Sequence, residues 1–262
     1  MIIKMTVGEG KVMGKLNGKT AVITGASKGI GAGIALAFAK EGANVVVNYA
    51  RAKDDAEKVA AQINQNGSKA ITVQADVSKK KDVDRLFAEA TKAFGKVDIL
   101  VNNAGVYEFA PLQEITEESY RRQFDLNVLG TLLSTQAAVK AMTNGGGSII
   151  NLSSLAALTP PPTSAVYSGT KGAVDVITRT LAQELGPQKI RVNSLSPGVV
   201  ETEGTRAGGF TEGEFKQTAV SRTPLGRIGQ PDDIAKVAVF LASDDSAWMT
   251  GEVLPVGGGA RL

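Results

Sequence analysis

The stretch TAVITGASKGIG, residues 20–31, decides the fold. Its first five residues form a short apolar run with the length and composition of a buried strand. Glycines follow at Gly25, Gly29 and Gly31, and the apolar periodicity of residues 30–41 then predicts a helix. Glycines at a strand-to-helix turn let the backbone approach a pyrophosphate, which lies at the N-terminus of the helix. The stretch therefore predicts a dinucleotide-binding turn.

The alternation of short apolar runs with longer amphipathic segments continues along the chain. Strands are predicted over residues 20–24, 43–49, 70–75, 98–102, 148–152, 190–195 and 252–256, and helices over residues 30–41, 53–66, 80–94, 118–142, 166–185 and 231–242. Apolar strands separated by helices are typical of a parallel sheet that is covered on both faces. No break in composition marks a second domain. We therefore predict a single α/β domain with a doubly wound parallel sheet.

Two segments fall outside this pattern. Residues 1–15 have no continuous apolar core and no cleavage site, so we interpret them as a flexible N-terminal arm before a catalytic domain of residues 16–262. Residues 201–230 are rich in glycine, threonine and glutamate and are predicted to be irregular. A loop of that length within a compact domain is usually a lid or a binding loop, so we predict a substrate lid there.

Composition excludes several classes of protein. The chain has 262 residues, 43% of them hydrophobic and 21% charged, with a formal net charge of +3. Basic residues are interspersed with acidic ones, so no basic stripe for nucleic acid is expected. No apolar run approaches the length of a membrane span. We expect a cytoplasmic protein that acts on a small molecule, with neither a nucleic-acid nor a membrane partner.

The sequence contains no cysteine and no histidine. This excludes disulfides, thiolate nucleophiles and imidazole bases. It also leaves no zinc site other than an all-carboxylate one, so no metal is expected. Proton transfer near neutral pH must therefore depend on tyrosine, lysine, aspartate or glutamate.

The segment SLAALTPPPTSAVYSGTK, residues 154–171, supplies such a group. Tyr167 and Lys171 are four residues apart, and the periodic apolar residues after them predict a helix that places both on one face. A phenol has a pKa near ~10, and a neighbouring ammonium lowers that pKa. We predict that Lys171, helped by a cationic cofactor ring, does this to Tyr167, and that Ser154 holds the oxygen that exchanges the proton. The alternative is a half-buried tyrosine beside a solvated lysine.

The end of the second predicted strand indicates which nicotinamide cofactor is favoured. A site for NAD usually has an aspartate or glutamate there for the ribose hydroxyls. This strand ends in Asn48, Tyr49, Ala50 and Arg51, with no acid. Lys28 in the glycine turn and Arg51 can together neutralise a 2′-phosphate. We predict a preference for NADP(H), with NAD(H) possible, and the alternative is that both cations are merely solvated.

Other predicted strands also end in residues suited to ligand binding. In a doubly wound sheet, ligands lie outside the carboxyl ends of the strands. Ordinary turn chemistry explains any one of these ends, but not their coincidence at one edge. The predicted cofactor-binding residues are Gly25, Ser27, Lys28, Gly29, Ile30, Gly31, Asn48, Tyr49, Ala50, Arg51, Asp76, Val77, Asn103, Ala104, Gly105, Tyr167, Lys171, Pro197, Gly198, Val200 and Thr202.

Together these motifs resemble the short-chain dehydrogenase/reductase family. The resemblance covers about residues 16–256 and rests on motifs in the family's order and spacing: TGASKGIG at 24–31, NNAG at 102–105, Asn127, Ser154, Tyr167-x-x-x-Lys171 and Pro197-Gly198. It implies a single-domain Rossmann fold with a seven-stranded parallel sheet and helices on both faces, usually assembled as a homotetramer through two long helices. It also implies a catalytic tetrad of Asn127, Ser154, Tyr167 and Lys171.

The resemblance gives each member of this tetrad a role. Ser154 would orient a carbonyl oxygen, and Tyr167 would donate its proton as hydride arrives. Lys171 would lower the pKa of the tyrosine and hold the nicotinamide ribose. Asn127 would anchor a water that links Lys171 to solvent. The family spacing selects Ser154 over Ser153, which on a strand would point to the opposite face.

The chain departs from the family at two places. It ends in VGGGARL, residues 256–262, where many relatives have an aspartate before the paired glycines. This leaves the end-to-end contacts of a tetramer open. The run of prolines at 160–162 is also unusual, and we expect it to stiffen one wall of the substrate pocket.

The predicted activity is reversible carbonyl reduction. NADPH would reduce a ketone or β-keto ester to a secondary alcohol with Tyr167 as the proton donor, and the reverse reaction is that of an alcohol dehydrogenase. The expected substrate walls are apolar, with few fixed charges; they are Tyr107, Ala156, Leu158, Gly198 and lid residues 203–222.

Three alternative functions stay open. A glucose-type sugar 1-dehydrogenase is one, because VVVNYARA at 45–52 resembles bacterial glucose dehydrogenases. A 3-oxoacyl-carrier-protein reductase is another, for which Arg121, Arg122 and Arg206 are candidate docking residues. A non-catalytic NADP(H) sensor is the third. Sensors of this kind generally lose the serine, tyrosine or lysine, and this chain keeps all three.

Overall fold

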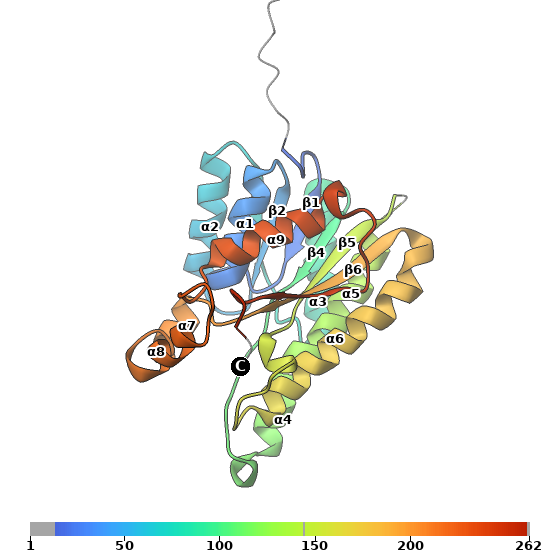
Figure 1. Cartoon of the computed structure of the whole chain (residues 1–262). Helices are drawn as coiled ribbons and strands as arrows, with labels where there is room; N and C mark the ends of the chain where they lie inside the picture. Colours follow the sequence, from blue (N-terminus) through green and yellow to red (C-terminus); the bar gives the residue numbers. More distant parts are fainter. Residues whose placement is uncertain (1–13, 144, 261–262) are drawn as a thin grey trace, which may run out of the picture.

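Seven parallel strands form one sheet at the centre of the molecule (Figure 1). This computed structural model describes residues 14–143 and 145–260. The strands are β1 (Thr20–Ile23), β2 (Asn44–Tyr49), β3 (Ala70–Gln74), β4 (Ile99–Asn102), β5 (Gly147–Leu152), β6 (Ile190–Pro197) and β7 (Val253–Val256). Their order in the sheet is β3-β2-β1-β4-β5-β6-β7, so the predicted doubly wound parallel sheet is confirmed.

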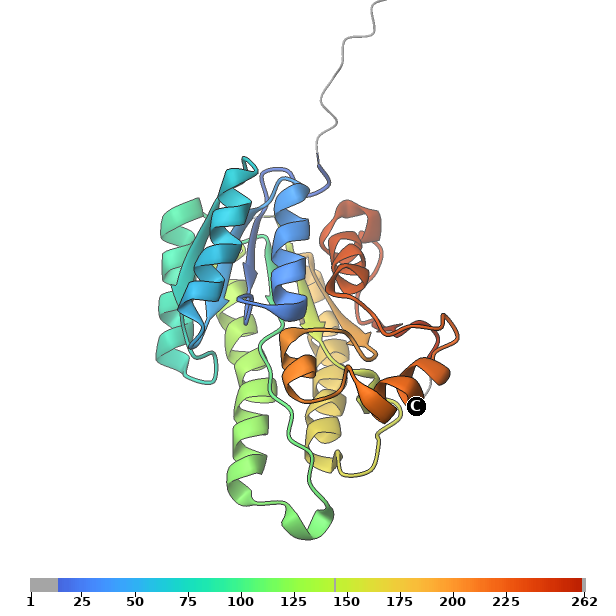
Figure 2. The ribbon, with the colours of Figure 1, turned by 90° about the vertical axis from the view of Figure 1, so that its left-hand side faces the viewer.

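Three helices cover each face of the sheet (Figures 1 and 2). One face carries α1 (Gly29–Lys40), α2 (Lys53–Gln65) and α9 (Pro231–Ala242), and the other carries α3 (Lys80–Phe94), α5 (Gly130–Ala141) and α6 (Ala165–Leu185). Successive side chains of a strand point to opposite faces. Within β1, Ile23 therefore packs in the core under α1, whereas Val22 packs in the core under α3.

The predicted helix over residues 118–142 is not one regular helix. The chain forms α4 (Glu117–Phe124), one π-helical turn (Asp125–Leu129) and then α5. The side-chain oxygen of Thr116 caps α4 by accepting a hydrogen bond from the backbone N–H of Ser119 at 3.1 Å. A π-helical turn inside a longer helix is frequent at functional sites, and this one contains Asn127.

The prediction that residues 201–230 are irregular is wrong. The segment contains α7 (Glu203–Ala207) and α8 (Gly213–Ser221), which lie beyond the carboxyl edge of the sheet (Figure 1). A capping box between Thr202 and Thr205 starts α7, a local signal that a long glycine-rich stretch conceals. Backbone hydrogen bonds from Glu201 to Gly229 and from Gly229 to Val199, both 2.8 Å, join the two ends of this lid.

The remaining short elements are single 3-10 turns. They lie at Leu112–Glu114, Leu155–Ala157, Gly186–Gln188 and Asp244–Ser246. Residues 1–13 of the predicted arm lie outside the described residues, but Lys15 pairs with Asp245 and its backbone N–H bonds to the carboxylate of Glu41. The folded unit therefore includes Lys15. In the described part of the chain, no helix is both long and apolar enough to cross a membrane.

The order of the strands determines where a ligand can bind. β1 pairs with β2 on one side and with β4 on the other. The order of the strands reverses between β1 and β4, because β2 and β3 lie on one side of β1 and the later strands lie on the other. In open α/β sheets the crevice for the ligand lies outside the carboxyl ends of the strands at such a point. The glycine turn after β1, the loop after β4 and the lid all meet at this edge.

Candidate active site

Thr24 at the end of β1 joins the glycine turn to the loop after β4. Its hydroxyl oxygen accepts hydrogen bonds from the backbone N–H groups of Asn103 at 2.9 Å and Ala104 at 3.0 Å. The side-chain amide of Asn103 in turn donates to the carbonyl oxygens of Thr24 at 2.9 Å and Gly25 at 3.0 Å. These bonds bring Gly25, Asn103 and Ala104 together, as the sequence predicts. Thr24 was not among the predicted residues, although it stands directly before the glycines.

The close approach of these two loops explains two of the glycines. A Cβ atom at Gly31 would lie 2.5 Å from Nδ2 of Asn103 and 2.6 Å from the carbonyl oxygen of Gly25. Gly25 has a φ of +62°, and its Cβ would lie 2.9 Å from Cα of Ala104. Any larger residue at either position would push the loops apart. The two glycines therefore let the turn pack directly against the loop after β4.

Asn48 supports the glycine turn from below. Its side-chain oxygen accepts the backbone N–H of Gly25 at 3.1 Å, and its amide nitrogen donates to the carbonyl oxygens of Val73 at 3.2 Å and Ala75 at 3.1 Å. Asn48 is buried, so its side chain positions the turn and does not face a ligand. The structure thus corrects the prediction for this one residue, because a polar strand residue can serve the backbone as well as a cofactor.

The predicted 2′-phosphate residues lie exposed at the same edge. Lys28 directly precedes α1, and Arg51 follows β2. Within residues 14–143 and 145–260, neither forms an ion pair with a carboxylate, and the first turn of α1 contains no acid. Both cations are therefore available to an anion. The neighbouring residues Tyr49 and Ala50 complete the end of β2 as predicted.

The end of β3 is organised around Asp76. Its carboxylate accepts hydrogen bonds from the backbone N–H of Ser78 at 3.0 Å and from the hydroxyl of Ser78 at 2.7 Å. Val77 is buried against Gly130 at the start of α5. This strand end shapes the crevice, but the polar groups of Asp76 are engaged within their own turn.

On the lid side, the first residues of α7 lie against the glycine turn. A Cβ atom at Gly29 would lie 3.3 Å from Cβ of Thr202. The carboxylate of Glu203 accepts the backbone N–H of Gly29 at 3.0 Å. Val200 is buried beneath this contact, and Gly198 approaches Gly257 closely. The predicted residues after β6 therefore do meet those after β1, and Glu203 joins them unpredicted.

Tyr167 and Lys171 lie on one face of α6, as the spacing predicts. Nζ of Lys171 is 5.8 Å from the centroid of the Tyr167 ring. In the protein alone, burial raises the pKa of Tyr167 and the hydrogen bond with Ser154 lowers it only in part, so the lowering by Lys171 together with a cofactor ring stays a prediction. The neutral phenol is thus the stable form, which suits a proton donor.

Lys171 is itself strongly perturbed. Its side chain is only 6% exposed, and Nζ donates to the carbonyl oxygen of Leu152 at 2.7 Å. Burial lowers the pKa of Lys171 to about 8, although the carboxylate of Asp175 opposes that shift. A lysine with this pKa still carries its proton at neutral pH. The alternative of a solvated lysine does not describe this site.

Ser153 and Ser154 follow β5, which ends at Leu152, and their side chains have separate environments. Ser154 lies beside Tyr167, and its side-chain oxygen accepts the backbone N–H of Ala156 at 3.1 Å. Ser153 is buried, and its hydroxyl donates to the backbone carbonyl oxygen of Lys171 at 3.2 Å. Ser154 is thus the serine beside Tyr167, and its contact with a substrate stays a prediction.

Asn127 fastens the loop after β4 to the long helices. Its side-chain oxygen accepts the N–H of Val106 at 2.8 Å, and its amide nitrogen donates to the carbonyl oxygen of Val106 at 2.8 Å and to the hydroxyl of Thr170 at 3.0 Å. A Cβ atom at Gly105 would lie 3.1 Å from Oδ1 of Asn127 and 3.7 Å from Nζ of Lys171. The four predicted catalytic residues thus converge on one place.

Asp175, one turn after Lys171, is a further buried group that the sequence prediction missed. The hydroxyl of Ser194 donates to its carboxylate at 3.0 Å, and burial raises its pKa. An aspartate in the apolar stretch of a helix, four residues from a lysine, was the available signal. It holds a negative charge behind Lys171 without reaching the open edge.

An aromatic cluster covers the open side of Tyr167. We define this cluster by its five rings, which come from the loop after β4, from α6 and from the lid: Tyr107, Phe109, Tyr167, Phe210 and Phe215. Tyr107 was predicted as a substrate wall, and Phe210 and Phe215 fall within the predicted lid. Phe109 was not predicted.

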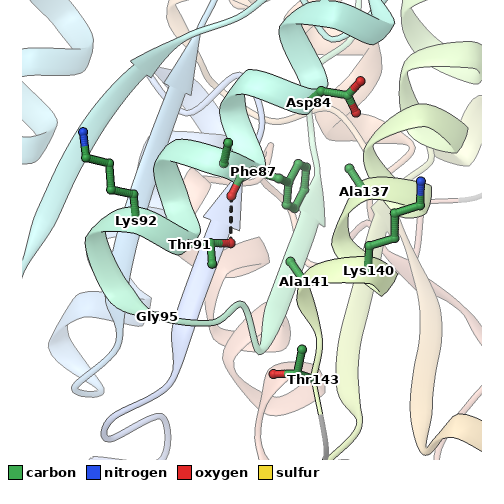
Figure 3. Close-up of a pocket in the computed structure, with 10 residues that line it drawn as sticks. Asp84, Phe87, Thr91, Lys92, Gly95, Ala137, Lys140, Ala141 and Thr143 are labelled. Atoms are coloured by element: carbon green, nitrogen blue, oxygen red, sulfur yellow. Dashed lines mark hydrogen bonds between the residues drawn. The ribbon is translucent and has the colours of Figure 1, made fainter.

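Two surface hollows lie away from this edge. One, of about 480 Å³, lies between α3 and α5 near Gly95 and Thr143, beside the starts of the strands (Figure 3). The other, of about 740 Å³, lies between α5 and α6 and includes Leu132, Val176 and Leu181. Neither hollow includes any of the predicted catalytic or cofactor-binding residues. The chemistry at the carboxyl edge is therefore separate from both.

The chain is similar to known oxidoreductases over almost its whole length. Residues 25–261 match the family model described as enoyl-(acyl carrier protein) reductase. An uncharacterized oxidoreductase of Methylorubrum extorquens is 59% identical over 249 residues, which is 95% of this chain and 100% of the relative. Versicolorin reductase 1 of Aspergillus parasiticus is 41% identical over 94% of this chain and 97% of its own length.

Two further proteins connect the fold with a cofactor and with reduction. A short-chain dehydrogenase of Burkholderia cenocepacia, solved in complex with NADP, superposes with a TM-score of 0.89 at 33% identity, over 95% of this chain and 100% of that one. A hydroxynaphthalene reductase-like protein of Metarhizium robertsii is 41% identical over 94% of this chain and 96% of its own length.

Proposed function

Because the chain belongs to the short-chain dehydrogenase/reductase family, we propose that it is an NADPH-dependent carbonyl reductase. It would convert a ketone or β-keto ester into a secondary alcohol and run in reverse as an alcohol dehydrogenase. One observation carries this proposal: Ser154, Tyr167 and Lys171 converge at the carboxyl edge that also contains the glycine turn.

The residues at this edge fit a nicotinamide dinucleotide. Gly25 and Gly31 let the turn pack against Asn103 and Ala104, and α1 begins there without an acid in its first turn. Backbone amides at a helix N-terminus suit a pyrophosphate. Asn103 contacts Gly25, and Thr202 lies beside Gly29, so both border the same turn. The reduced nicotinamide, when bound, supplies the hydride.

The protein side chains would then orient and protonate the carbonyl oxygen. Ser154 donates a hydrogen bond that orients and polarises the carbonyl. As the carbon gains the hydride and its electron pair, the O–H bond of Tyr167 breaks, and the proton forms the hydroxyl of the alcohol. Lys171, still protonated near neutral pH, stabilises the phenolate that is left. Asn127 holds the loop at Val106 and, in our proposal, also orders the water that returns a proton.

We infer a preference for NADPH over NADH from the charges around the ribose position. Lys28 and Arg51 are exposed cations without carboxylate partners among the described residues, and the end of β2 has no acid that would bind ribose hydroxyls. The Burkholderia relative binds NADP. Comparable specificity constants for the two cofactors would contradict this inference.

The arginines do not favour a carrier-protein substrate. Arg121 pairs with Glu117, and Arg206 pairs with Glu201. Arg122 likewise pairs with a carboxylate, that of Glu108. An acidic carrier would need unpaired cations near the entrance. The relatives named as reductases of versicolorin and hydroxynaphthalene favour free small-molecule substrates.

We propose that the protein assembles as a homotetramer. The exposed side of α5 and α6 carries Leu132, Val176 and Leu181 around a shallow hollow, and an apolar surface of this kind marks an interface. Trp248, before β7, is fully exposed at 101% and indicates a second contact. Light scattering should give four subunits, and Val176→Glu should give smaller species, whereas a monomeric wild type would contradict assembly.

A substrate panel with both cofactors tests the proposed function. Ketones, β-keto esters and sugars would be assayed with NADPH and NADH, or with their oxidised forms, in the presence of EDTA. We expect turnover of ketones with NADPH, unaffected by the chelator because the chain has no histidine or cysteine. Oxidation of sugars alone would favour the sugar dehydrogenase, and NADPH binding without turnover of any substrate would favour the sensor.

A further inference from the structure

We propose that the substrate class of this site is a neutral aryl ketone, whose ring packs against the aromatic cluster while its carbonyl reaches Tyr167. The inference rests on the proposed function and names the substrate of the same site. It is carried by the geometry, exposure and charge of the rings around the reactive hydroxyl, independently of what the relatives reduce.

Five of the six ring pairs in the cluster meet edge to face, and the sixth, Tyr107 with Phe109, is tilted at 37°. The rings of Tyr107 and Phe109 have centroids 5.8 Å apart, and each lies against Tyr167, at 6.1 Å and 72° and at 5.9 Å and 74° respectively. Phe210 lies 5.9 Å from both. These distances and angles are those that aromatic rings prefer. The surface next to the reactive phenol is therefore made of ring edges and faces.

The charged residue between two of these rings in the sequence, Glu108, has its partners outside the cluster. Glu108 separates Tyr107 from Phe109 in the chain, but its carboxylate accepts a hydrogen bond from Ser119 and pairs with Arg122, both on α4. The cluster itself contains no charged side chain. Lys171 lies 5.8 Å from the Tyr167 ring but is buried, so the exposed rings offer a charged substrate no counter-ion.

The rings are left exposed where a substrate must enter. Tyr107 is 38% exposed, Phe109 42% and Phe215 46%. An exposed apolar patch beside a reactive group marks a binding surface. A sugar would bring several hydroxyls that lose water against the rings, and of the five rings only Tyr107 and Tyr167 carry a hydroxyl that could pair with them. An aryl ring would instead replace water with edge-to-face contacts.

One wall of the cluster is fixed and the other is adjustable. The backbone N–H of Ala110 donates to the carbonyl oxygen of Thr163 at 2.9 Å, which ties the loop of Phe109 to the segment before α6. Phe210, in contrast, lies between Gly209 and Gly213, whose φ angles are +75° and +58°. Glycines on both sides let the Phe210 ring retreat when a substrate ring enters above Phe109.

A pair of matched ketones tests the inference. Acetophenone and cyclohexyl methyl ketone are similar in size, but only the aryl carbonyl is conjugated with its ring, so the change in their kcat/KM ratio when a cluster ring is altered reports the ring contact. We expect acetophenone to be favoured at least about tenfold, because several edge-to-face contacts act together. Phe109→Leu should reduce this ratio roughly 3- to 10-fold. Tyr120→Leu, which removes an exposed ring of α4 that stacks on Phe124 outside the cluster, should leave it unchanged.

Two results would overturn the inference while the proposed function stands: equal specificity for the two ketones, or a ratio that Phe109→Leu does not alter. Binding provides a readout without turnover. In the Tyr167→Phe variant with NADP, saturation-transfer NMR should show acetophenone ring protons close to the protein, and adding Phe109→Leu should remove that signal. If neither ketone is reduced, this signal still supports the aryl site, and its absence overturns it.

Discussion

The cofactor side and the substrate side of the crevice are built by different means. On the cofactor side, Thr24, Asn48 and Asn103 hold the glycine turn through hydrogen bonds to backbone groups, and side chains are excluded by close contact. On the substrate side, rings from the loop after β4 and from the lid supply the surface. The first arrangement tolerates almost no change in shape. The second can be altered ring by ring without disturbing the sheet.

The largest effect is expected where the cofactor side is tightest. Gly31→Ala places a Cβ atom 2.5 Å from Asn103 and should weaken NADPH binding about 10- to 100-fold, because the two loops must separate. NADPH fluorescence titration measures this directly. Gly186→Ala, where no atom lies within 4 Å of the added Cβ, is the matched control. Equal affinity in both variants would show that the turn is not rigid.

The charges beside that turn should control cofactor choice. Arg51→Asp removes a cation from the expected 2′-phosphate position and adds an anion, so kcat/KM with NADPH should fall roughly 10- to 100-fold while that with NADH changes little. Lys92→Asp, at the far end of α3, is the control for net charge (Figure 3). A parallel loss with both cofactors would place Arg51 elsewhere in the mechanism.

Burial of the charged Lys171 should lower the free energy of unfolding at neutral pH. Below pH 8 both the folded and unfolded states hold its proton, and the folded state bears a cost of about 3 kcal/mol from the lowered pKa. Between pH 8 and about 10.5 only the unfolded state keeps the proton, so the free energy of unfolding should rise with pH.

Lys171→Met should therefore be inactive yet more stable than the wild type at pH 7, by about 1–3 kcal/mol, with the difference shrinking towards pH 9.5. Urea unfolding at several pH values measures it, and Lys92→Met is the control for an exposed lysine. The opposite pH dependence, in which the wild type is more stable than the variant by an amount that grows as the pH falls, would contradict this account.

The smallest effect concerns the contact between Glu203 of the lid and the glycine turn. The carboxylate of Glu203 lies on the amide of Gly29, where a cofactor phosphate would carry the same charge. Glu203→Gln keeps a hydrogen-bond acceptor and removes the charge, so NADPH affinity should increase about 2- to 5-fold at low salt. Glu214→Gln on α8 is the control. Unchanged affinity would mean that Glu203 does not compete with the cofactor.

The sequence predicts the cofactor side well because its signals are local. The glycines after β1 and the order of strands and helices follow from spacing and periodicity alone. Features that depend on the fold are not predicted. In the sequence Asn48 has the position of a cofactor-binding residue, but in the structure β2 pairs with β3 and the Asn48 amide donates to the carbonyl oxygen of Val73. The π-helical turn at Asn127 and the capping box at Thr202 are short signals within long segments.

The substrate side was less predictable because its contacts join residues that are far apart in the sequence. Phe109 and Phe210 are a hundred residues apart, and only the folded lid brings their rings together. The direction of the pKa shift of Tyr167 also depends on burial, which spacing to Lys171 does not give. Residue types show which chemistry is possible, and the packing around them decides the protonation state.

The most direct test of the account is the Tyr167→Phe variant, studied by stopped-flow oxidation of NADPH with a ketone substrate and by NADPH titration. The account predicts that affinity for NADPH stays within about twofold and that hydride transfer slows by about 10²–10⁴, the contribution of a positioned proton donor. Hydride transfer at the wild-type rate in this variant would contradict the assignment of Tyr167 as the acid.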